Sequence, residues 1–240
     1  MKKITLLIPC YNEEKSIAKV IDSVPKDKLK KAGYNIEILV INNNSKDKTA
    51  EIAKKKGARV IDENKQGKGN AIKTGFKSLS KDTDYVVMVD GDNTYNPNEM
   101  LRLIEPLDSG FCDVVIGSRL EGKMNGNALS LSHRLANWFF TFITRHFYSN
   151  ANVSDTCTGY FAWTRKAITT LNGYIQSGGF AIEAEMITKM SRLGLHIFSV
   201  PITYSPRHAE TKSNLHPIGD GLKITHMLLR NINWKPTANR

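Results

Sequence analysis

The stretch from Tyr85 to Tyr95, YVVMVDGDNTY, joins a short apolar run to two carboxylates that lie two residues apart. The run from Tyr85 to Val89 is typical of a strand buried in a parallel sheet, and it delivers Asp90 and Asp92 to the exposed end of that strand. Hard oxygen ligands at this spacing suit Mg²⁺ or Mn²⁺, and Mg²⁺ commonly keeps one or two protein carboxylates while substrate phosphates complete its shell. Although Asp and Gly are also ordinary turn residues, the string predicts a metal site that serves a diphosphate.

The segments around this strand repeat the order of a strand followed by a helix. Apolar runs predict strands at residues 4–8, 36–41, 58–61, 85–89 and 113–116, and periodicity predicts helices at 13–24, 49–56, 70–79 and 97–107. This alternation is typical of an α/β fold with a mostly parallel sheet flanked by helices. In such sheets ligands bind beyond the carboxyl ends of the strands, where the two aspartates are expected. No GxGxxG motif follows the first strand, which argues against a dehydrogenase.

The composition indicates one basic domain without a disulfide framework. Lys and Arg outnumber Asp and Glu by 34 to 23 in 240 residues, so the surface should attract polyanions such as nucleic acid, phosphorylated ligands or an anionic leaflet. Cys10, Cys112 and Cys157 are far apart and are expected to be packing residues of a protein in a reducing compartment. The first apolar strand is too short for a signal peptide, and no stretch approaches about 20 apolar residues. We therefore expect a cytoplasmic protein without a transmembrane helix.

Two segments have the periodicity of amphipathic helices. Residues 127–148 carry Leu135, Trp138, Phe139, Phe142 and Ile143 along one side, while Arg134, Asn137, Thr141 and Arg145 lie mainly on the other. Residues 222–234 place apolar side chains near Lys223 and Arg230. Each pattern is typical either of a core helix with a solvated face or of a helix lying in a membrane interface. Two such segments in a basic chain favour the membrane surface, and both alternatives stay open at this point.

Short motifs follow one another along nearly the whole chain. They are Pro9 to Glu13 (PCYNE), Asn42 to Thr49 (NNNSKDKT), Gly67 to Ala71 (GKGNA), Asp90 to Asp92 (DGD), Gly117 to Arg119 (GSR), Asp155 to Phe161 (DTCTGYF) and a basic region with Pro201, Tyr204, Arg207 and Lys212. Their order resembles the family 2 inverting glycosyltransferases with a GT-A fold, particularly the branch that makes polyprenyl-phosphate sugars such as dolichyl-phosphate mannose or glucose. The resemblance implies a Rossmann-like, mostly parallel central sheet with amphipathic, interfacial elements near the C-terminus. It implies a catalytic domain at residues 1–215, with an acceptor-side helix at 127–148, and a C-terminal amphipathic helix and tail at 216–240.

The resemblance also implies roles for individual residues. The nucleotide sugar would be bound by Pro9, Tyr11, Glu13, Asn42, Gly67, Lys68, Asp90 and Gly91, and the metal, Mg²⁺ or Mn²⁺, by Asp90 and Asp92. The acceptor phosphate would be bound by Arg119, Arg134, Arg207 and Lys212, and the catalytic residues would be Asp92, Arg207 and Asp155. Asn42 stands where the family usually has Asp. Because an amide both donates and accepts hydrogen bonds, whereas a carboxylate only accepts them, the choice between UDP and GDP stays open. Asn44 stands where the family often has Gly, and Asn tolerates the left-handed backbone such a turn needs.

The implied reaction transfers a hexose or N-acetylhexosamine from a nucleoside-diphosphate sugar to a polyprenyl or dolichyl phosphate at the cytoplasmic face of a membrane, which supplies lipid-linked sugar for glycan assembly. An acceptor phosphate is already anionic at neutral pH and needs no strong general base. A sugar hydroxyl acceptor is the alternative, and it would require a carboxylate base such as Asp155, Glu183 or Glu185. A nucleotidyltransferase would be expected to open with a glycine-rich basic loop, which residues 9–14 lack. The chain carries no recognised nucleic-acid-binding motif, so no nucleic acid partner is expected.

Overall fold

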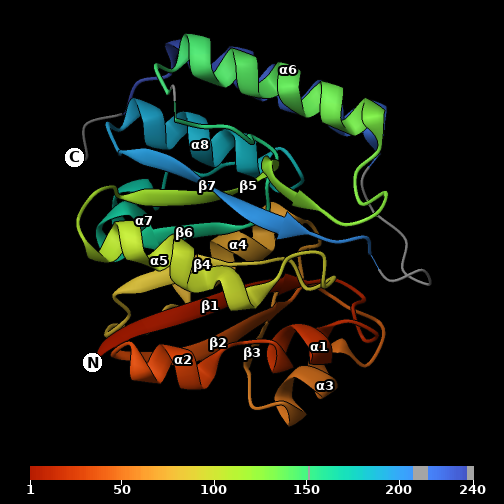
Figure 1. Cartoon of the computed structure of the whole chain (residues 1–240). Coiled ribbons are helices and arrows are strands. Elements are labelled where there is room, and N and C mark those ends of the chain that lie inside the picture. The colour runs from red at the N-terminus through yellow and green to blue at the C-terminus, as the bar shows by residue number, and fades with distance from the viewer. Residues whose placement is uncertain (151, 208–215, 237–240) are drawn as a thin grey trace.

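The computed structural model describes residues 1–150, 152–207 and 216–236, and within them seven strands form one sheet (Figure 1). The strands are β1 (Lys2–Cys10), β2 (Tyr34–Asn42), β3 (Arg59–Asp62), β4 (Tyr85–Met88), β5 (Val114–Met124), β6 (Phe161–Thr164) and β7 (Ile197–Tyr204). They lie in the order β3-β2-β1-β4-β6-β5-β7, and among them only β6 runs antiparallel to its neighbours. The mostly parallel α/β sheet predicted from the sequence is confirmed.

The register of the central strands brings three loops to one edge of the sheet. Cys10 at the end of β1 pairs with Asn42 at the end of β2, and Leu7 of β1 pairs with Met88 at the end of β4. The loops that follow these three strands therefore leave the sheet together at its carboxyl edge. Ligands of open parallel sheets bind at this edge.

Helices cover both faces of the sheet and add a third layer on one side. They are α1 (Ile17–Asp22), α2 (Lys26–Lys31), α3 (Thr49–Lys55), α4 (Lys68–Lys77), α5 (Met100–Asp108), α6 (Leu131–Phe147), α7 (Arg165–Leu171), α8 (Ile182–Arg192) and α9 (Pro217–Arg230), with short 3₁₀ turns at Pro97–Glu99 and Asn231–Asn233. One face of the sheet packs against α1, α2, α3 and α5, and the other packs against α4, α7 and α8. α6 and α9 lie outside α8 and share a small apolar cluster with it; Figure 1 shows α6 above α8.

Most predicted strands and helices lie within a few residues of those observed, and the differences have physical reasons. The first helix begins at Ile17 instead of residue 13, because Asn12 has a left-handed φ of 55° and a turn at Glu13 precedes the helix. β5 extends to Met124 because it pairs with β7 beyond a register shift. The periodicity did not predict α2, β6, α8 or β7. In α8 the charged residues Glu183, Glu185 and Lys189 are buried, so the apolar pattern of a core helix is interrupted.

Helix α6 buries several polar side chains and exposes most of its large apolar ones, which is the reverse of a core helix. Its buried side chains include Asn137, Thr141 and Thr144. Its exposed side chains include Leu131, Leu135, Trp138, Phe139, Phe142 and Phe147. The alternative of a core helix with a solvated polar face is therefore wrong for this segment. The polar side chains face inward because the loop before β6 offers hydrogen-bonding partners, such as the Thr156 backbone N, which donates to Thr141 Oγ1 at 3.1 Å. Throughout the described ranges, every helix is too short or too polar to cross a bilayer.

Candidate active site

Asp90 and Asp92 lie in the loop after β4, at the carboxyl edge of the sheet. Asp92 is 3% exposed, and its Oδ1 accepts hydrogen bonds from the Thr94 backbone N at 3.0 Å and from Thr94 Oγ1 at 2.7 Å. These bonds fix the carboxylate while Oδ2 meets Arg207. Gly159 approaches so closely that an added Cβ would lie 2.4 Å from Asp90 Oδ2. Any side chain at that position would displace the first aspartate.

Lys68 connects the first aspartate to helix α8. It opens α4 directly after Gly67, whose φ of 130° and whose close approach to Gly178 O, 2.2 Å from an added Cβ, both require glycine. Lys68 Nζ lies 2.7 Å from Asp90 Oδ1 and 2.5 Å from Glu183 Oε1. Burial lowers the pKa of Lys68, but the two carboxylates raise it well above its ordinary value, so the lysine stays charged.

Arg207 bridges two further carboxylates of the site. It pairs with Asp92, and its Nη1 lies 3.2 Å from Glu13 Oε1. Burial raises the pKa of Glu13 to about 7 and also raises the pKa of Asp92. The cluster holds the four carboxylates of Glu13, Asp90, Asp92 and Glu183 against the two cations of Lys68 and Arg207. The carboxylates outnumber the cations by two, so one divalent cation would balance the cluster when all four carboxylates are ionised.

The donor set also fits a hard cation shared with a substrate. Among the residues that the structure describes, no three His, Cys, Asp or Glu side chains form a ready-made ligand group. Asp90 and Asp92 could hold one ion if a diphosphate supplied further oxygens, which is how Mg²⁺ is commonly bound. A cleft opens over these carboxylates and is lined by Pro9, Tyr11, Glu13, Gly67, Lys68, Asp90, Gly91, Asp92 and Arg207. The structure thus brings together all the predicted nucleotide-sugar residues except Asn42.

The cleft contains Asn43 in place of Asn42. Asn42 Nδ2 donates to Asp62 Oδ1 on the neighbouring strand at 2.7 Å, whereas Asn43 lines the cleft and accepts a hydrogen bond from the Gly67 backbone N at 2.6 Å. The residue of this motif that reaches the cleft is therefore one position later than the predicted Asn42. Phe180, just before α8, also lines the cleft, and no sequence motif marks it. Asn44 has a φ of 60°, as predicted for a residue in place of glycine.

A second cavity, of about 430 Å³, lies beside the first on the side of α6 and α9. Arg119, Tyr204 and Arg207 provide cationic and polar lining, and the two helices provide Ala136, Phe140 and Ile224. Arg207 lines both spaces, so the cleft and the cavity meet at this side chain.

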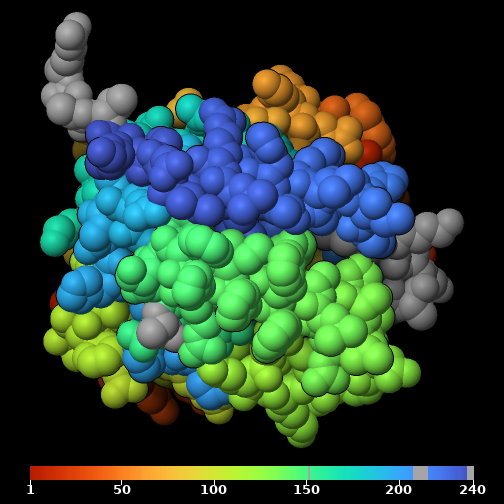
Figure 2. Space-filling model, turned by 90° about the horizontal axis from the view of Figure 1, so that it is seen from above, coloured from red at the N-terminus to blue at the C-terminus, as the bar shows by residue number. Residues whose placement is uncertain are grey.

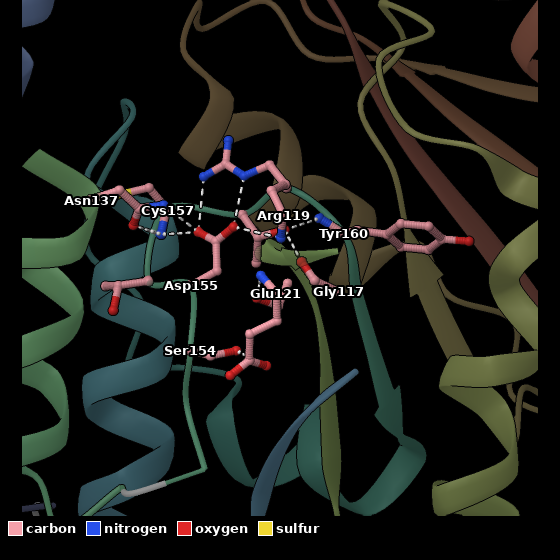
Figure 3. A network of polar contacts seen from close by, with 12 residues as sticks. Gly117, Arg119, Glu121, Asn137, Ser154, Asp155, Cys157 and Tyr160 are labelled. Atoms are coloured by element: carbon pink, nitrogen blue, oxygen red, sulfur yellow. Dashed lines mark hydrogen bonds and ion pairs between the residues drawn. The ribbon is translucent and has the colours of Figure 1, made fainter. Parts of the chain in front are cut away.

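Arg119 is held in this cavity by a buried ion pair with Asp155 (Figure 3). Asp155 Oδ2 accepts from Arg119 Nε at 2.8 Å and from its backbone N at 2.9 Å, while Oδ1 accepts from Nη2 at 2.9 Å. Asn137 Nδ2 and the Cys157 backbone N also donate to Oδ1, at 2.7 and 3.2 Å. The guanidinium of Arg119 lies 5.2 Å from the centre of the Tyr204 ring. Five hydrogen bonds thus hold the Asp155 carboxylate, and this carboxylate in turn orients the guanidinium of Arg119.

The predicted acceptor-phosphate residues do not all gather. Arg119 and Arg207 line the cavity, whereas Arg134 is exposed on α6 and lines neither the cleft nor the cavity. Lys212 lies outside the described residues. Asp155, predicted as catalytic, is fully buried behind Arg119 and meets the cavity only through it.

Comparison with known proteins identifies the family. Residues 5–171 match the model of glycosyl transferase family 2. The chain belongs to this family. It is a glycosyltransferase that uses a nucleotide sugar, as the diphosphate site predicted from the sequence suggests.

Curated relatives of this family 2 enzyme include three from Haloferax volcanii. The chain is 34% identical to glycosyltransferase AglJ over 221 residues, covering 91% of this chain and 68% of AglJ. It is 34% identical over 232 residues to the low-salt glycan biosynthesis hexosyltransferase Agl6, of which it spans only 53%. It is 30% identical to a dolichyl-phosphate hexose transferase over 227 residues, covering 95% of this chain and 92% of that protein.

A solved structure confirms the predicted GT-A fold. Glucosyl-3-phosphoglycerate synthase from Mycobacterium tuberculosis, in complex with Mn²⁺, UDP and glucosyl-3-phosphoglycerate, aligns with a TM-score of 0.73 at 23% identity. The alignment covers 99% of this chain and 82% of that one. At this identity the likeness concerns the fold alone.

The carboxylates considered as general bases are already engaged in this family 2 enzyme. Asp155 accepts the five hydrogen bonds described above, and Glu185 pairs with Lys189 at 2.6 Å and accepts from the Ser177 backbone N at 2.7 Å. Glu183 pairs with Lys68, which also pairs with Asp90. Of the three, only Glu183 lies beside the cleft.

Proposed function

We propose that the enzyme transfers a hexose or N-acetylhexosamine from a UDP- or GDP-sugar to a polyprenyl or dolichyl phosphate, with inversion and with the help of Mg²⁺ or Mn²⁺. The observation that carries this proposal is the cavity lined by Arg119 and Arg207 beside the carboxylate cleft. Two guanidinium groups suit a phosphate, because their N–H groups donate charge-assisted hydrogen bonds to its anionic oxygens. The similarity to a dolichyl-phosphate hexose transferase supports the same acceptor.

On the donor side, Asp90 and Asp92 would hold the ion together with the diphosphate. When bound, the ion would neutralise charge on the nucleoside diphosphate as it leaves the anomeric carbon. The glucosyl-3-phosphoglycerate synthase that shares this fold is described with Mn²⁺ and UDP, so the fold is able to accommodate a donor and a metal of this kind. Tyr11 and Asn43 line the cleft and would contact the nucleoside, and Lys68 would keep Asp90 oriented.

On the acceptor side, Arg119 and Arg207 would position a phosphate oxygen for attack on the anomeric carbon from the face opposite the leaving group. Because this oxygen is already anionic, the reaction needs no proton acceptor, which agrees with the engagement of Asp155 in five hydrogen bonds. We therefore assign Asp155 a positioning role behind Arg119 instead of a role as base. Positioning and charge complementarity would supply most of the rate gain.

The enzyme would meet its lipid acceptor through the exposed faces of α6 and α9, which lie side by side in Figure 2. α9 adds Ile218, Leu222 and Leu229 to the exposed apolar side chains of α6. Arg134, Arg145, Lys223 and Arg230 are exposed on the same two helices, and the one acidic residue in these ranges, Asp220, is buried. An apolar face with a basic rim is complementary to an anionic leaflet. We name these two helices the docking face.

Replacing Trp138 and Phe142 together by Ser should lower binding to phosphatidylglycerol vesicles by at least about ten-fold, because burial of each ring in a membrane is worth roughly 1.5–3 kcal/mol. Their exposed fractions are 64% and 52%. Cosedimentation with vesicles measures the effect. Phe111→Ser, which changes an exposed ring outside the docking face, should leave binding unchanged. Equal binding of the double variant and the native protein would exclude this face.

The reaction itself is tested by incubating the purified protein with Mn²⁺ or Mg²⁺, a short polyprenyl phosphate and a panel of radiolabelled UDP- and GDP-sugars. We expect label in the organic phase with one donor, in a product that mild acid cleaves. Label that appears only on added saccharides or on a small hydroxyl acceptor would instead establish a hydroxyl-directed transferase, with Glu183 as the first base to examine. No binding of any sugar nucleotide in the presence of Mn²⁺ would contradict the donor site.

A further inference from the structure

Besides the apolar cluster that it shares with α8 and α9, helix α6 makes polar contacts with the loop before β6. The Thr156 backbone N donates to Thr141 Oγ1 at 3.1 Å, and the hydroxyls of Thr144 and Thr156 lie 3.0 Å apart. Asn137 is 3% exposed and makes two contacts, donating to Asp155 Oδ1 at 2.7 Å and accepting from the Cys157 backbone N at 3.2 Å. The exposed face of the same helix is apolar, so these inward bonds fix how the docking face meets the site.

Asn137 differs from its neighbours on α6 in what it reaches. Thr141 and Thr144 bond to Thr156, whereas the amide of Asn137 bonds to the carboxylate that holds Arg119. Figure 3 shows Asn137 and Arg119 on opposite sides of the Asp155 carboxylate. Asn137 also lines the 430 Å³ cavity together with Arg119.

The orientation of the Arg119 guanidinium depends on this carboxylate. The carboxylate of Asp155 accepts hydrogen bonds from Nε and Nη2 of Arg119. Figure 3 shows the third nitrogen of the guanidinium, Nη1, pointing away from the carboxylate. The plane of the guanidinium, and hence the direction of Nη1, is set by the two parallel bonds to Asp155. Besides Arg119 Nη2, two donors hold Oδ1, namely the Asn137 amide at 2.7 Å and the Cys157 backbone N at 3.2 Å. Asn137 makes the shorter of these two bonds and makes it from helix α6, so its loss would loosen the carboxylate and the guanidinium that the carboxylate orients.

We propose that Asn137 is a positioning residue for the acceptor. By donating to Asp155, it fixes the orientation in which Arg119 meets the acceptor phosphate, and it makes that orientation depend on the position of helix α6. This inference rests on the proposed lipid-phosphate acceptor and deepens it. The consequence is a selective one. Loss of the Asn137 amide should weaken acceptor binding and spare the donor, because the donor cleft is lined by other residues.

The test compares Asn137→Ala and Asn137→Leu with Thr141→Val. Asn137→Leu keeps a side chain of similar volume and removes the donor without adding a charge, so it separates the lost bond from a change in cavity shape. Thr141→Val removes a bond from the same helix to the same loop without touching Asp155. We expect both Asn137 variants to raise the KM for polyprenyl phosphate about ten-fold or more, with the KM for the sugar nucleotide changed less than about two-fold. Thr141→Val should shift neither KM by more than about two-fold, at a comparable thermal midpoint.

Calorimetric binding of dodecyl phosphate to the same proteins makes the test independent of turnover. Weaker binding in the Asn137 variants alone supports the inference even if the native enzyme transfers no sugar to polyprenyl phosphate, in which case the proposed function has failed and the positioning role has not. The inference is overturned if Thr141→Val weakens acceptor or dodecyl phosphate binding as much as Asn137→Ala does. It is also overturned if the native protein does not bind dodecyl phosphate, or if donor and acceptor KM rise together.

Discussion

Asp92→Asn should reduce sugar transfer by about three orders of magnitude, while the metal-free protein stays folded with an unchanged or higher thermal midpoint. Activity falls because the change removes one of the two carboxylates expected to hold the divalent ion, and loss of such charge stabilisation commonly costs factors of this size. Stability follows a different rule. Burial raises the pKa of Asp92, which means that its charged form is disfavoured in the folded metal-free protein, and a neutral amide removes that penalty at neutral pH. Transfer assays and thermal unfolding of the same preparation measure both effects.

Asp22→Asn is the matched control for this change. Asp22 ends α1, pairs with Lys56 at the surface and lines neither the cleft nor the cavity. Its replacement should leave transfer and Mn²⁺ binding as they are. If Asp92→Asn kept the activity of the native enzyme, the metal assignment would be wrong; if it unfolded without Mn²⁺, the assumed burial penalty would be wrong.

The parts of the site that follow strand ends could be predicted, because the parallel register fixes their place. Once the runs ending at Ile8, Ile41 and Val89 were recognised as parallel strands, Asp90 and the PCYNE turn had to lie at the same edge. The one-residue error between Asn42 and Asn43 has a related cause. The last residue of β2 still pairs with its neighbours, so its side chain is directed by the pleat toward Asp62, and only the next residue is able to turn into the cleft.

The parts of the site that depend on polar contacts between segments far apart in the sequence could not be predicted. The polar side of α6 is buried because Asn137 and Thr141 meet the loop at residues 153–158, a contact between segments that periodicity treats separately. Burial of Glu183 likewise depends on Lys68, more than a hundred residues away in the chain. A helical wheel separates polar from apolar faces, but the partners of each face decide which one turns inward.

Asp155→Ala should lower the free energy of unfolding by about 3–5 kcal/mol, because it leaves the guanidinium of Arg119 buried without its counter-charge. Asp155 is fully buried and Arg119 is 7% exposed, and water that enters through the cavity beside Arg119 would lack the counter-charge that Asp155 supplies. Urea denaturation measures the change. Asp22→Ala, which breaks the exposed pair with Lys56, should cost less than about 1 kcal/mol.

The double variant Arg119→Met and Asp155→Leu separates the structural from the functional use of the pair. Removing both charges leaves no buried ion without a partner, so the double variant should recover much of the stability that Asp155→Ala loses. Sugar transfer to polyprenyl phosphate should stay lost, because the cavity then keeps only Arg207 of its two guanidinium groups. Recovery of transfer along with stability would show that Arg119 supports the fold of the loop alone and takes no part in binding the acceptor. Failure to recover stability would show instead that the hydrogen bonds from Asn137 and Cys157 to the carboxylate, and not the charge pair, hold the loop before β6 in place.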